Sequence, residues 1–510
     1  MPRLPATRVH RARRGDMRSD IRQIVQAFGR QRVLVVGDAI LDRYLHGSEL
    51  RFCREAPVPN VTIDNAVDRA GGAANTALNL RALGADVSFM GVLGDDSVGD
   101  TLHELLCSHG IRLEPTVRQR GRPTRAKHRV VASSQLLLSF DTGTRDPVDA
   151  ASERTLMTSL LDRAGEYDAI VVADYGYGTV TDAVIDALAY RRRHTGRERL
   201  VIDSRHRLPQ FAVTRPDAVK PNFEEAGALA PELMRVSRED RAAAVTAAAP
   251  RLARLTGARL TAVTLDSAGA ALIAAGSVHR VLAPPVPNPL AAGAGDTFTA
   301  TLALALAAGA PDALAGELAC RAASCVVGKE GTATCSSAEL LGCFSDEAKR
   351  IDSIDALVRL AAQYRAQGRR IVLTNGCFDI LHRGHVAMLD QARRLGDVLV
   401  VGVNGDESIR RVKGPGRPIN TLDDRLQVLS ALGCVDHVIA FHEDTSNALV
   451  RAARPHVFVK GGSYTRETLP EAAVVEECGG TLHLLPYLAQ SSTTGLIERI
   501  SARSGAELAA

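Results

Sequence analysis

The chain has 510 residues, of which 45% are hydrophobic and 24% are charged, and its formal net charge is +4. This length exceeds one typical domain of about 100 to 200 residues, and the composition excludes a disordered chain. No apolar run of about 18 residues lacks charges or glycine breaks, and the nine cysteines include no CxxC pair, so we expect no membrane span, disulfide framework or zinc ribbon. A cytoplasmic protein fits these features.

A basic arm opens the chain. Residues 1–32 contain nine Arg and two Asp, a charge of +7, so the remaining 478 residues sum to −3. The arm lacks the apolar segment of a secretion signal, and it is either a disordered extension, which we favour, or a nucleic-acid-binding or transit-like tail. Because the rest of the chain is slightly acidic, we expect no nucleic-acid partner.

Strand-like runs then alternate with helical stretches, which predicts an α/β fold. The runs are rich in β-branched residues and most of them end in Gly or Asp, as is typical of parallel strands buried on both faces with a site at their carboxyl ends. One series lies at 32–38, 86–95, 169–176, 199–205, 218–222 and 260–266, and a second at 369–379, 397–406, 435–441 and 456–462. A charged helical stretch separates the series, so we predict domains at 33–340 and 369–510, joined by a linker helix at 341–368.

A glycine-rich turn, "AAGAGDTF" (291–298), opens a long apolar helix near the end of the first series. Small residues at Gly293, Ala294 and Gly295 let backbone N–H groups approach a phosphate, which the helix N-terminus also favours. Asp296 would then stand where a carboxylate takes the proton of an attacking hydroxyl. Taken alone, a tight loop with Asp296 as helix cap explains the same letters.

The segments "GDAILDRY" (37–44) and "AGGAANTALNL" (70–80), followed by this turn, resemble the ribokinase-like sugar kinases of the PfkB family over about 33–340. The resemblance implies an ATP-dependent sugar kinase. It places sugar hydroxyls at Asp42, Gly71, Gly72 and Asn75, Mg-bound phosphate at Asn222 and Glu225, and nucleotide contacts at Thr264 and Gly269. Helix capping by Asn75 and a capping box of Asn222 with Glu225 remain alternatives.

Within that family, "EAPVP" (55–59), "RPTRAKHRV" (122–130) and "CVVGKEGTAT" (325–334) are most similar to the heptose 7-phosphate kinase branch. A phosphorylated sugar needs cationic partners. The candidates are Lys127, Arg129, Arg51 and Arg54, each of which is otherwise a solvated surface charge.

The chain departs from that branch at three places. A lysine usual in an Asp-Tyr-x-Lys-Gly stretch is Tyr177, an Asp-Pro-Lys is Asp203-Ser204-Arg205, and the Thr usual before the glycine turn is Ala292. These changes leave Asp296 intact. They affect the nucleotide side and the phosphate-binding lysines.

In the second series, "TNGCFDILHRGHV" (374–386) predicts a strand, a turn and a helix with His382 and His385 on one face. A zinc site would need further ligands, and the pair lacks the i, i+4 spacing and the internal Glu of a metalloprotease. Core histidines are the other alternative. Because Gly384 lets backbone approach an anion at the helix start, a phosphate chain is the favoured ligand.

This stretch, together with "VNGDESIRRVKGPGRP" (403–418), "HVFVKGGSY" (456–464) and "SSTTGLI" (491–497), resembles the HxGH nucleotidyltransferases, and the heptose 1-phosphate adenylyltransferase domain in particular. The resemblance implies that His382, His385 and Lys413 contact phosphate. It places the ribose or base near Asn404 and Asp406 and the rest of the nucleotide pocket at Thr374, Gly376, Phe378, Lys460 and Gly461, with Ser492 and Thr493 capping the triphosphate or only their own helix.

Together the two resemblances imply a bifunctional enzyme that uses ATP and Mg²⁺ and forms a homodimer. It would phosphorylate D-glycero-D-manno-heptose 7-phosphate at C1 and adenylylate heptose 1-phosphate to ADP-heptose and pyrophosphate. The alternatives are another sugar phosphate or nucleotide, or an adenylyltransferase whose kinase half has decayed to a regulatory domain.

Overall fold

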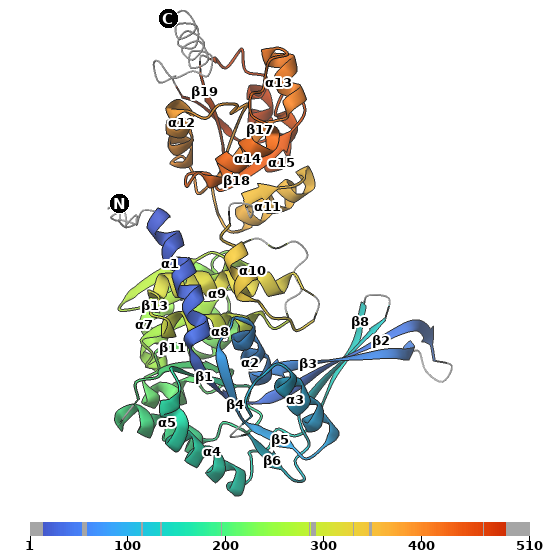
Figure 1. The fold of residues 1–510 in the computed structure, drawn as a ribbon, viewed down its shortest axis with the longest axis vertical. Coiled ribbons are helices and arrows are strands. Elements are labelled where there is room, and N and C mark those ends of the chain that lie inside the picture. The colour runs from blue at the N-terminus through green and yellow to red at the C-terminus, as the bar shows by residue number, and fades with distance from the viewer. Residues whose placement is uncertain are drawn as a thin grey trace, which may run out of the picture. The chain divides into compact units, whose positions relative to one another are not determined.

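The fold was obtained as a computed structural model, which describes residues 14–53, 59–113, 116–132, 135–194, 196–284, 286, 292–329, 331–345, 349–462 and 464–485. The chain divides into two compact units, Met1–Cys343 and Phe344–Ala510. Each unit holds its own sheet, and the predicted α/β class is confirmed (Figure 1).

The first unit is built on an eight-stranded sheet in which the six strands from β12 to β4 run parallel and β13 and β14 extend the edge antiparallel. In spatial order the strands are β14 (Ser277–Val281), β13 (Ala270–Ala274), β12 (Leu260–Thr264), β11 (Ala218–Val219), β10 (Arg199–Ser204), β9 (Ala169–Asp174), β1 (Arg32–Gly37) and β4 (Asp86–Met90). Every residue of β9 is buried, as the continuous apolar runs predict.

The helices of this unit follow most of its strands, as right-handed crossovers between parallel strands require. They are α1 (Arg14–Ala27), α2 (Ala73–Ala82), α3 (Ser97–Ser108), α4 (Ala150–Arg163), α5 (Asp182–His194), α6 (Phe223–Leu229), α7 (Arg241–Thr256), α8 (Ala294–Ala307), α9 (Asp312–Val327) and α10 (Ser337–Gly342). Nearly the whole of α8 is buried.

The predicted disordered arm is wrong over residues 14–31. These residues form α1 and a short 3-10 turn, and Ile21, Val25 and Phe28 are buried. Their i, i+4 and i+3 spacing places them on one helix face, so apolar burial outweighs the repulsion among the arginines.

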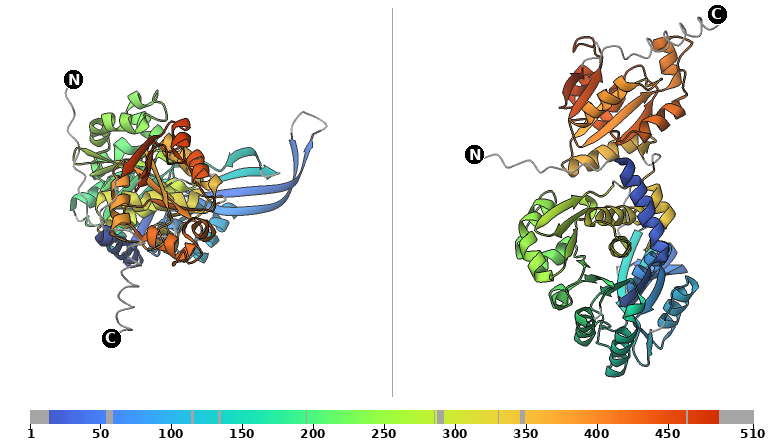
Figure 2. Two further views of the ribbon diagram at one scale, coloured as in Figure 1. Left: turned by 90° about the horizontal axis from the view of Figure 1, so that it is seen from above. Right: turned by 60° about the vertical axis from the view of Figure 1, so that its left-hand side comes forward.

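A separate four-stranded sheet, in the order β3-β2-β7-β8, extends away from the main sheet of the first unit (Figures 1 and 2). Its strands are β2 (Ala39–Phe52), β3 (Pro59–Gly72), β7 (Ala126–Ala132) and β8 (Gln135–Thr142). The sequence did not predict this sheet, because its strands mix polar and apolar residues and β8 is largely exposed. A further pair, β5 (Val92–Gly94) and β6 (Val117–Gln119), completes the unit.

The second unit holds a six-stranded parallel sheet in the order β15-β18-β17-β16-β19-β20. The strands are β15 (Arg350–Ile351), β16 (Ile371–Gly376), β17 (Val398–Asn404), β18 (His437–Phe441), β19 (Val457–Gly461) and β20 (Thr481–Leu485). The helices are α11 (Ile354–Ala366), α12 (Arg383–Arg393), α13 (Asp406–Lys413), α14 (Leu422–Ala431), α15 (Asn447–Ala453) and α16 (Ala472–Glu477).

The predicted linker helix is part of this second unit. Leu357, Ala361 and Tyr364 of α11 are buried in its core, and β15 pairs with β18. The unit therefore begins well before residue 369, because the helical periodicity of the charged stretch carries an apolar face that packs on the sheet. Among the helices that the structure describes, none is long and apolar enough to cross a membrane.

Candidate active sites

The glycine turn of the first unit leads directly into α8. Gly293 has a φ of 81°, in the left-handed region that favours glycine, and a Cβ there would lie 2.9 Å from Asn75 Nδ2. A Cβ on Gly295 would lie 3.2 Å from Lys220 Nζ. Both glycines thus lie close against neighbouring side chains at the helix N-terminus, where backbone N–H groups can bind an anion.

Asp296 is held in the first turn of α8 with only 7% of its surface exposed. Asn75 Nδ2 donates to Asp296 Oδ2 at 2.7 Å, and the Tyr175 hydroxyl donates to Oδ1. Burial raises the pKa of Asp296 to about 6, against the two hydrogen bonds, which favour its ionised form. The carboxylate can therefore accept a proton near neutral pH.

Tyr175 owes its position to Asp38, which follows β1. Asp38 Oδ2 accepts hydrogen bonds from the backbone N–H of Tyr175 at 2.9 Å and of Tyr177 at 3.0 Å. These bonds fix the loop after β9 beside the N-terminus of α8. Tyr175 is a site residue that the sequence did not predict, because its contact with Asp296 spans 121 positions.

The predicted sugar-side residues meet at the root of the four-stranded sheet. Asp42 Oδ1 accepts from Arg129 at 2.7 Å, and Oδ2 accepts from the Thr332 hydroxyl at 3.1 Å. A Cβ on Gly71 would lie 2.5 Å from Asp42 Oδ2, so a side chain there would displace the carboxylate. Thr332, also not predicted, lies beside the glycine turn as well, 3.1 Å from where a Cβ on Gly293 would be.

The remaining residues predicted to bind the sugar phosphate are Gly72 and the cationic side chains. Gly72 has a φ of 58° and precedes α2, which presents Asn75 to Asp296. Lys127 lies opposite Asp42 in the register of β2 and β7. Arg129 pairs with Asp42, so part of its charge is compensated before any sugar phosphate binds. Arg54 lies outside the described residues, as does the side chain of Arg51.

At the expected nucleotide site, Asn222 and Glu225 adopt the helix-capping geometry that the sequence predicts as an alternative. Asn222 and Glu225 form a reciprocal capping box at α6, with both N–H to oxygen distances at 2.8 Å. Thr264 forms a bridge with Asn222, and Gly269 approaches the Val281 carbonyl so closely that a Cβ would lie 2.1 Å from it. Burial raises the pKa of Glu225, whereas the charge of Lys220 opposes this rise.

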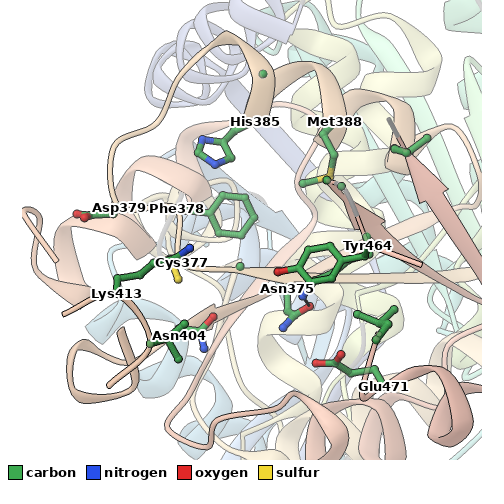
Figure 3. Close-up of a pocket in the computed structure, with 18 of the residues that line it drawn as sticks. Asn375, Cys377, Phe378, Asp379, His385, Met388, Asn404, Lys413, Tyr464 and Glu471 are labelled. Carbon is green, nitrogen blue, oxygen red and sulfur yellow. Dashed lines mark hydrogen bonds between the residues drawn. The ribbon is translucent and has the colours of Figure 1, made fainter. Parts of the chain in front are cut away.

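The second unit contains a cavity of about 480 Å³ over the carboxyl ends of β16, β17 and β19. Its walls include most of the residues predicted there, namely Gly376, Phe378, His382, His385, Asn404, Lys413, Lys460 and Gly461. Figure 3 shows His385, Lys413 and Tyr464 approaching the cavity from different sides. Unpredicted wall residues include Asn375, Met388, Tyr464 and Glu471.

Two predicted residues do not line this cavity. Thr374 is fully buried in β16 with its hydroxyl 4.0 Å from Met388 Sδ, and Asp406 pairs with Arg425 at 2.6 Å. The strand alternation turns Thr374 into the core. Ser492 and Thr493 lie outside the described residues.

His382 and His385 stand together at the start of α12. His382 caps the helix through Nδ1, which accepts from Gly384 N at 3.2 Å, and the two rings stack with centroids 3.9 Å apart. His382 Nε2 and His385 Nδ1 are buried and have no hydrogen-bond partner among the residues that the structure describes. Burial lowers both pKa values, that of His385 to about 4 with a smaller contribution from His382.

These unsatisfied ring nitrogens favour a polar ligand over a core role, because buried polar atoms are normally hydrogen-bonded. The described residues contain no group of three metal-ligating side chains, so the zinc alternative finds no support there. Neutral imidazoles can still donate N–H bonds to phosphate oxygens.

Lys460 provides a cation in the wall of the cavity. Its Nζ donates to Asn375 Oδ1 at 2.6 Å and lies 5.3 Å from the Tyr464 ring. Burial lowers its pKa. Together with Lys413, it makes the cavity suitable for phosphate groups.

Known proteins match both units. Residues 30–339 match the pfkB family of carbohydrate kinases, and residues 373–488 match the cytidylyltransferase-like family. The bifunctional protein HldE of Azotobacter vinelandii is 40% identical over 492 residues, covering 93% of this chain and 98% of that protein. The HldE of Desulfatibacillum aliphaticivorans is 36% identical over 481 residues, covering 93% and 97%.

The chain belongs to the HldE family. Membership confirms the predicted pairing of a sugar kinase with a nucleotidyltransferase in one enzyme. Phosphofructokinase-2 of Escherichia coli, solved with potassium, shares the fold of the first unit, with a TM-score of 0.51, 19% identity, and coverage of 61% of this chain and 97% of that one.

The structure also describes the three places where this chain departs from the residues usual in the heptose 7-phosphate kinase branch. Tyr177 is buried, and the guanidinium of Arg125 lies 4.7 Å from its ring centre. Arg205 is exposed, and Ala292 opens the glycine turn. None of the three displaces Asp296 from its partners, Asn75 and Tyr175.

Proposed function

We propose that the first domain transfers the γ-phosphoryl group of ATP to O1 of D-glycero-D-manno-heptose 7-phosphate, and that the second adenylylates heptose 1-phosphate to ADP-heptose. The observation that carries the kinase assignment is Asp296, buried beside an open glycine turn. For the transferase it is the pair of unsatisfied histidine nitrogens in the cavity. Since the second reaction uses a sugar without the 7-phosphate, a separate phosphatase must act between them.

In the kinase step, Asp296 accepts the proton of the anomeric hydroxyl as its oxygen bonds to the γ-phosphorus and ADP leaves. Asp42 and Asn75 would orient sugar hydroxyls, and backbone N–H groups of Gly293 to Gly295 would bind phosphate. The half-buried carboxylate of Glu225 suits Mg²⁺, a cation that prefers oxygen ligands and neutralises phosphate charge when bound.

In the transferase step no strong base is needed. A sugar phosphate has a second pKa of about 6 and is already ionised at neutral pH, so it can attack the α-phosphorus while pyrophosphate leaves. His382 and His385 would donate hydrogen bonds to the phosphate oxygens, and Lys413 and Lys460 would balance their charge. The protein thus acts by alignment and charge stabilisation.

Mass spectrometry of the products tests both assignments. With ATP, Mg²⁺ and heptose 7-phosphate, we expect a heptose bisphosphate, and after addition of a phosphatase that removes the 7-phosphate, ADP-heptose. Parallel reactions with other sugar phosphates and nucleotides address the alternative substrates. A chain that adenylylates heptose 1-phosphate but phosphorylates none of the sugars would favour the decayed kinase instead.

The kinase should depend on pH through Asp296. Its pKa is raised from 3.8 to about 6, so protonation removes the base as the pH falls through about 6 rather than about 4. We expect kcat to fall by about tenfold for each pH unit below that value. The measurement keeps the concentration of substrate dianion constant, and an unchanged kcat down to about pH 5 would refute the assignment.

We also propose a cytoplasmic homodimer formed through the four-stranded sheet. Alternation along β8 places Leu138 and Phe140 on one face, with exposures of 55% and 41%, and such apolar surface favours a second copy. Leu138→Asp should yield monomers in light scattering, whereas Ser139→Asp, on the opposite face of β8, should leave the mass unchanged. A wild-type monomer would exclude this assembly.

A further inference from the structure

Lys220 is a buried cation beside the glycine turn that the sequence did not predict as a site residue. It follows β11, and only 6% of its surface is exposed. Its Nζ is the one heavy atom, among the non-neighbouring described residues, within 4 Å of the position a Cβ on Gly295 would take. The ammonium therefore borders the space above the turn, where the phosphate is expected.

One ion pair holds the ammonium there, and its acidic partner is itself held by a threonine. Lys220 Nζ lies 2.8 Å from Asp203 Oδ2, and the Thr299 hydroxyl of α8 donates to the same oxygen at 2.8 Å. The Lys220 backbone N–H also donates to Ile202 O at 3.0 Å. The side chain is thus anchored through Asp203 of β10, which α8 holds in turn, and no other hydrogen bond of the ammonium is found within the part of the chain that the structure describes.

The surrounding charges keep Lys220 protonated. Burial alone would lower its pKa, but the neighbouring carboxylates, Asp203 first and then Glu225 and Asp296, leave it raised. Phosphoryl transfer needs fixed positive charge near the γ-phosphate. At position 177, where the resemblance leads one to expect a lysine, this chain has a buried tyrosine.

We propose that Lys220 is a catalytic residue of the kinase, donating hydrogen bonds to the γ-phosphoryl oxygens during transfer. The sugar oxygen forms its bond to phosphorus, the bond to the ADP oxygen breaks, and Asp296 takes the hydroxyl proton. Lys220 keeps its own proton throughout and stabilises the negative charge. This inference rests on the proposed phosphorylation by the first domain.

The competing explanation is that Lys220 only neutralises Asp203. Lys220→Met, Asp203→Asn and the double variant separate the two roles, because the double variant removes the buried carboxylate charge together with the ammonium. If Lys220 is catalytic, Lys220→Met lowers kcat for phosphorylation by about 10²- to 10³-fold. The double variant regains thermal stability but not rate.

Further measurements on the full chain test whether Lys220→Met affects phosphoryl transfer alone, and not nucleotide binding or the second domain. Affinity for ADP, which lacks the γ-phosphoryl group, should stay within about twofold of wild type by calorimetry, and adenylylation in the same chain should be unchanged. Lys220→Arg should recover part of kcat. Arg259→Met, which removes a cation paired with Asp312 at the opposite ends of the strands, is the matched control and should keep the wild-type rate.

Near-wild-type kcat in the double variant would overturn the inference and leave Lys220 a counter-ion. The same conclusion would follow if Lys220→Met kept its kcat. The wild-type activity is measured first, so that failure of the proposed function can be told apart from failure of this inference. A wild-type chain that phosphorylates no sugar would overturn the proposed function itself, and the catalytic role of Lys220 with it.

Discussion

Replacing Asp296 with alanine should abolish phosphorylation of heptose 7-phosphate and leave adenylylation intact. The buried carboxylate is positioned by Asn75 and Tyr175 and is the proposed proton acceptor, so its loss should lower kcat by about 10²- to 10⁴-fold. Both activities can be measured on one preparation, the kinase by ADP release and the transferase by pyrophosphate release.

Asp312→Ala is the matched control, because Asp312 also stands in the first turn of a helix, α9, but pairs with Arg259. It should retain the wild-type phosphorylation rate. Residual phosphorylation above about one tenth of wild type in Asp296→Ala would show that another group accepts the proton.

The same substitution has offsetting effects on stability. A pKa raised from 3.8 to about 6 means that the folded state binds this proton more tightly, so the ionised carboxylate costs about 3 kcal/mol, a cost present above about pH 6 and absent below about pH 4. Alanine removes that cost but leaves Asn75 and Tyr175 without their acceptor, at about 1 to 3 kcal/mol each. We therefore expect a loss of activity without a large loss of folding stability.

The central parallel strands of both main sheets can be predicted from sequence because burial on both faces produces continuous apolar runs, whereas the outer strands β13, β14, β15 and β20 were not predicted. Each predicted run contains a strand, from β1 to β19. The four-stranded sheet could not be predicted in this way, because β8 is largely exposed and its residues follow no one-sided burial pattern. The helix over 354–366 was predicted, but its packing on the sheet of the second unit was not.

Some residues of the two sites could likewise be predicted from the sequence, and others could not. Residues within one motif, such as Gly293 to Asp296 or His382 to His385, are identified by local spacing. Tyr175 and Thr332 reach their partners across 121 and 290 positions, and Lys220 approaches Gly295 from the end of another strand, so no local pattern signals these contacts. Thr374 was predicted from its motif to line the nucleotide pocket, but its position in the strand directs its side chain into the core.

Replacing His385 with alanine should have the opposite effect to Asp296→Ala. Its Nδ1 is buried and has no partner within the described ranges of the chain, and its pKa of about 4 keeps the ring neutral at neutral pH, so an N–H bond to a phosphate oxygen is its available contribution. Loss of one such donor should lower kcat for adenylylation by about 10²- to 10³-fold and leave phosphorylation unchanged.

His483→Ala, at an exposed position of β20, should keep both activities and serves as the control. Because alanine also removes the ring that stacks on His382, His385→Gln is a useful companion, since its amide N–H can replace part of the lost hydrogen bond. If His385 acts through that bond, glutamine should recover some kcat while alanine does not. Equal activity of both variants with wild type would show that His385 does not contact the transferred phosphate.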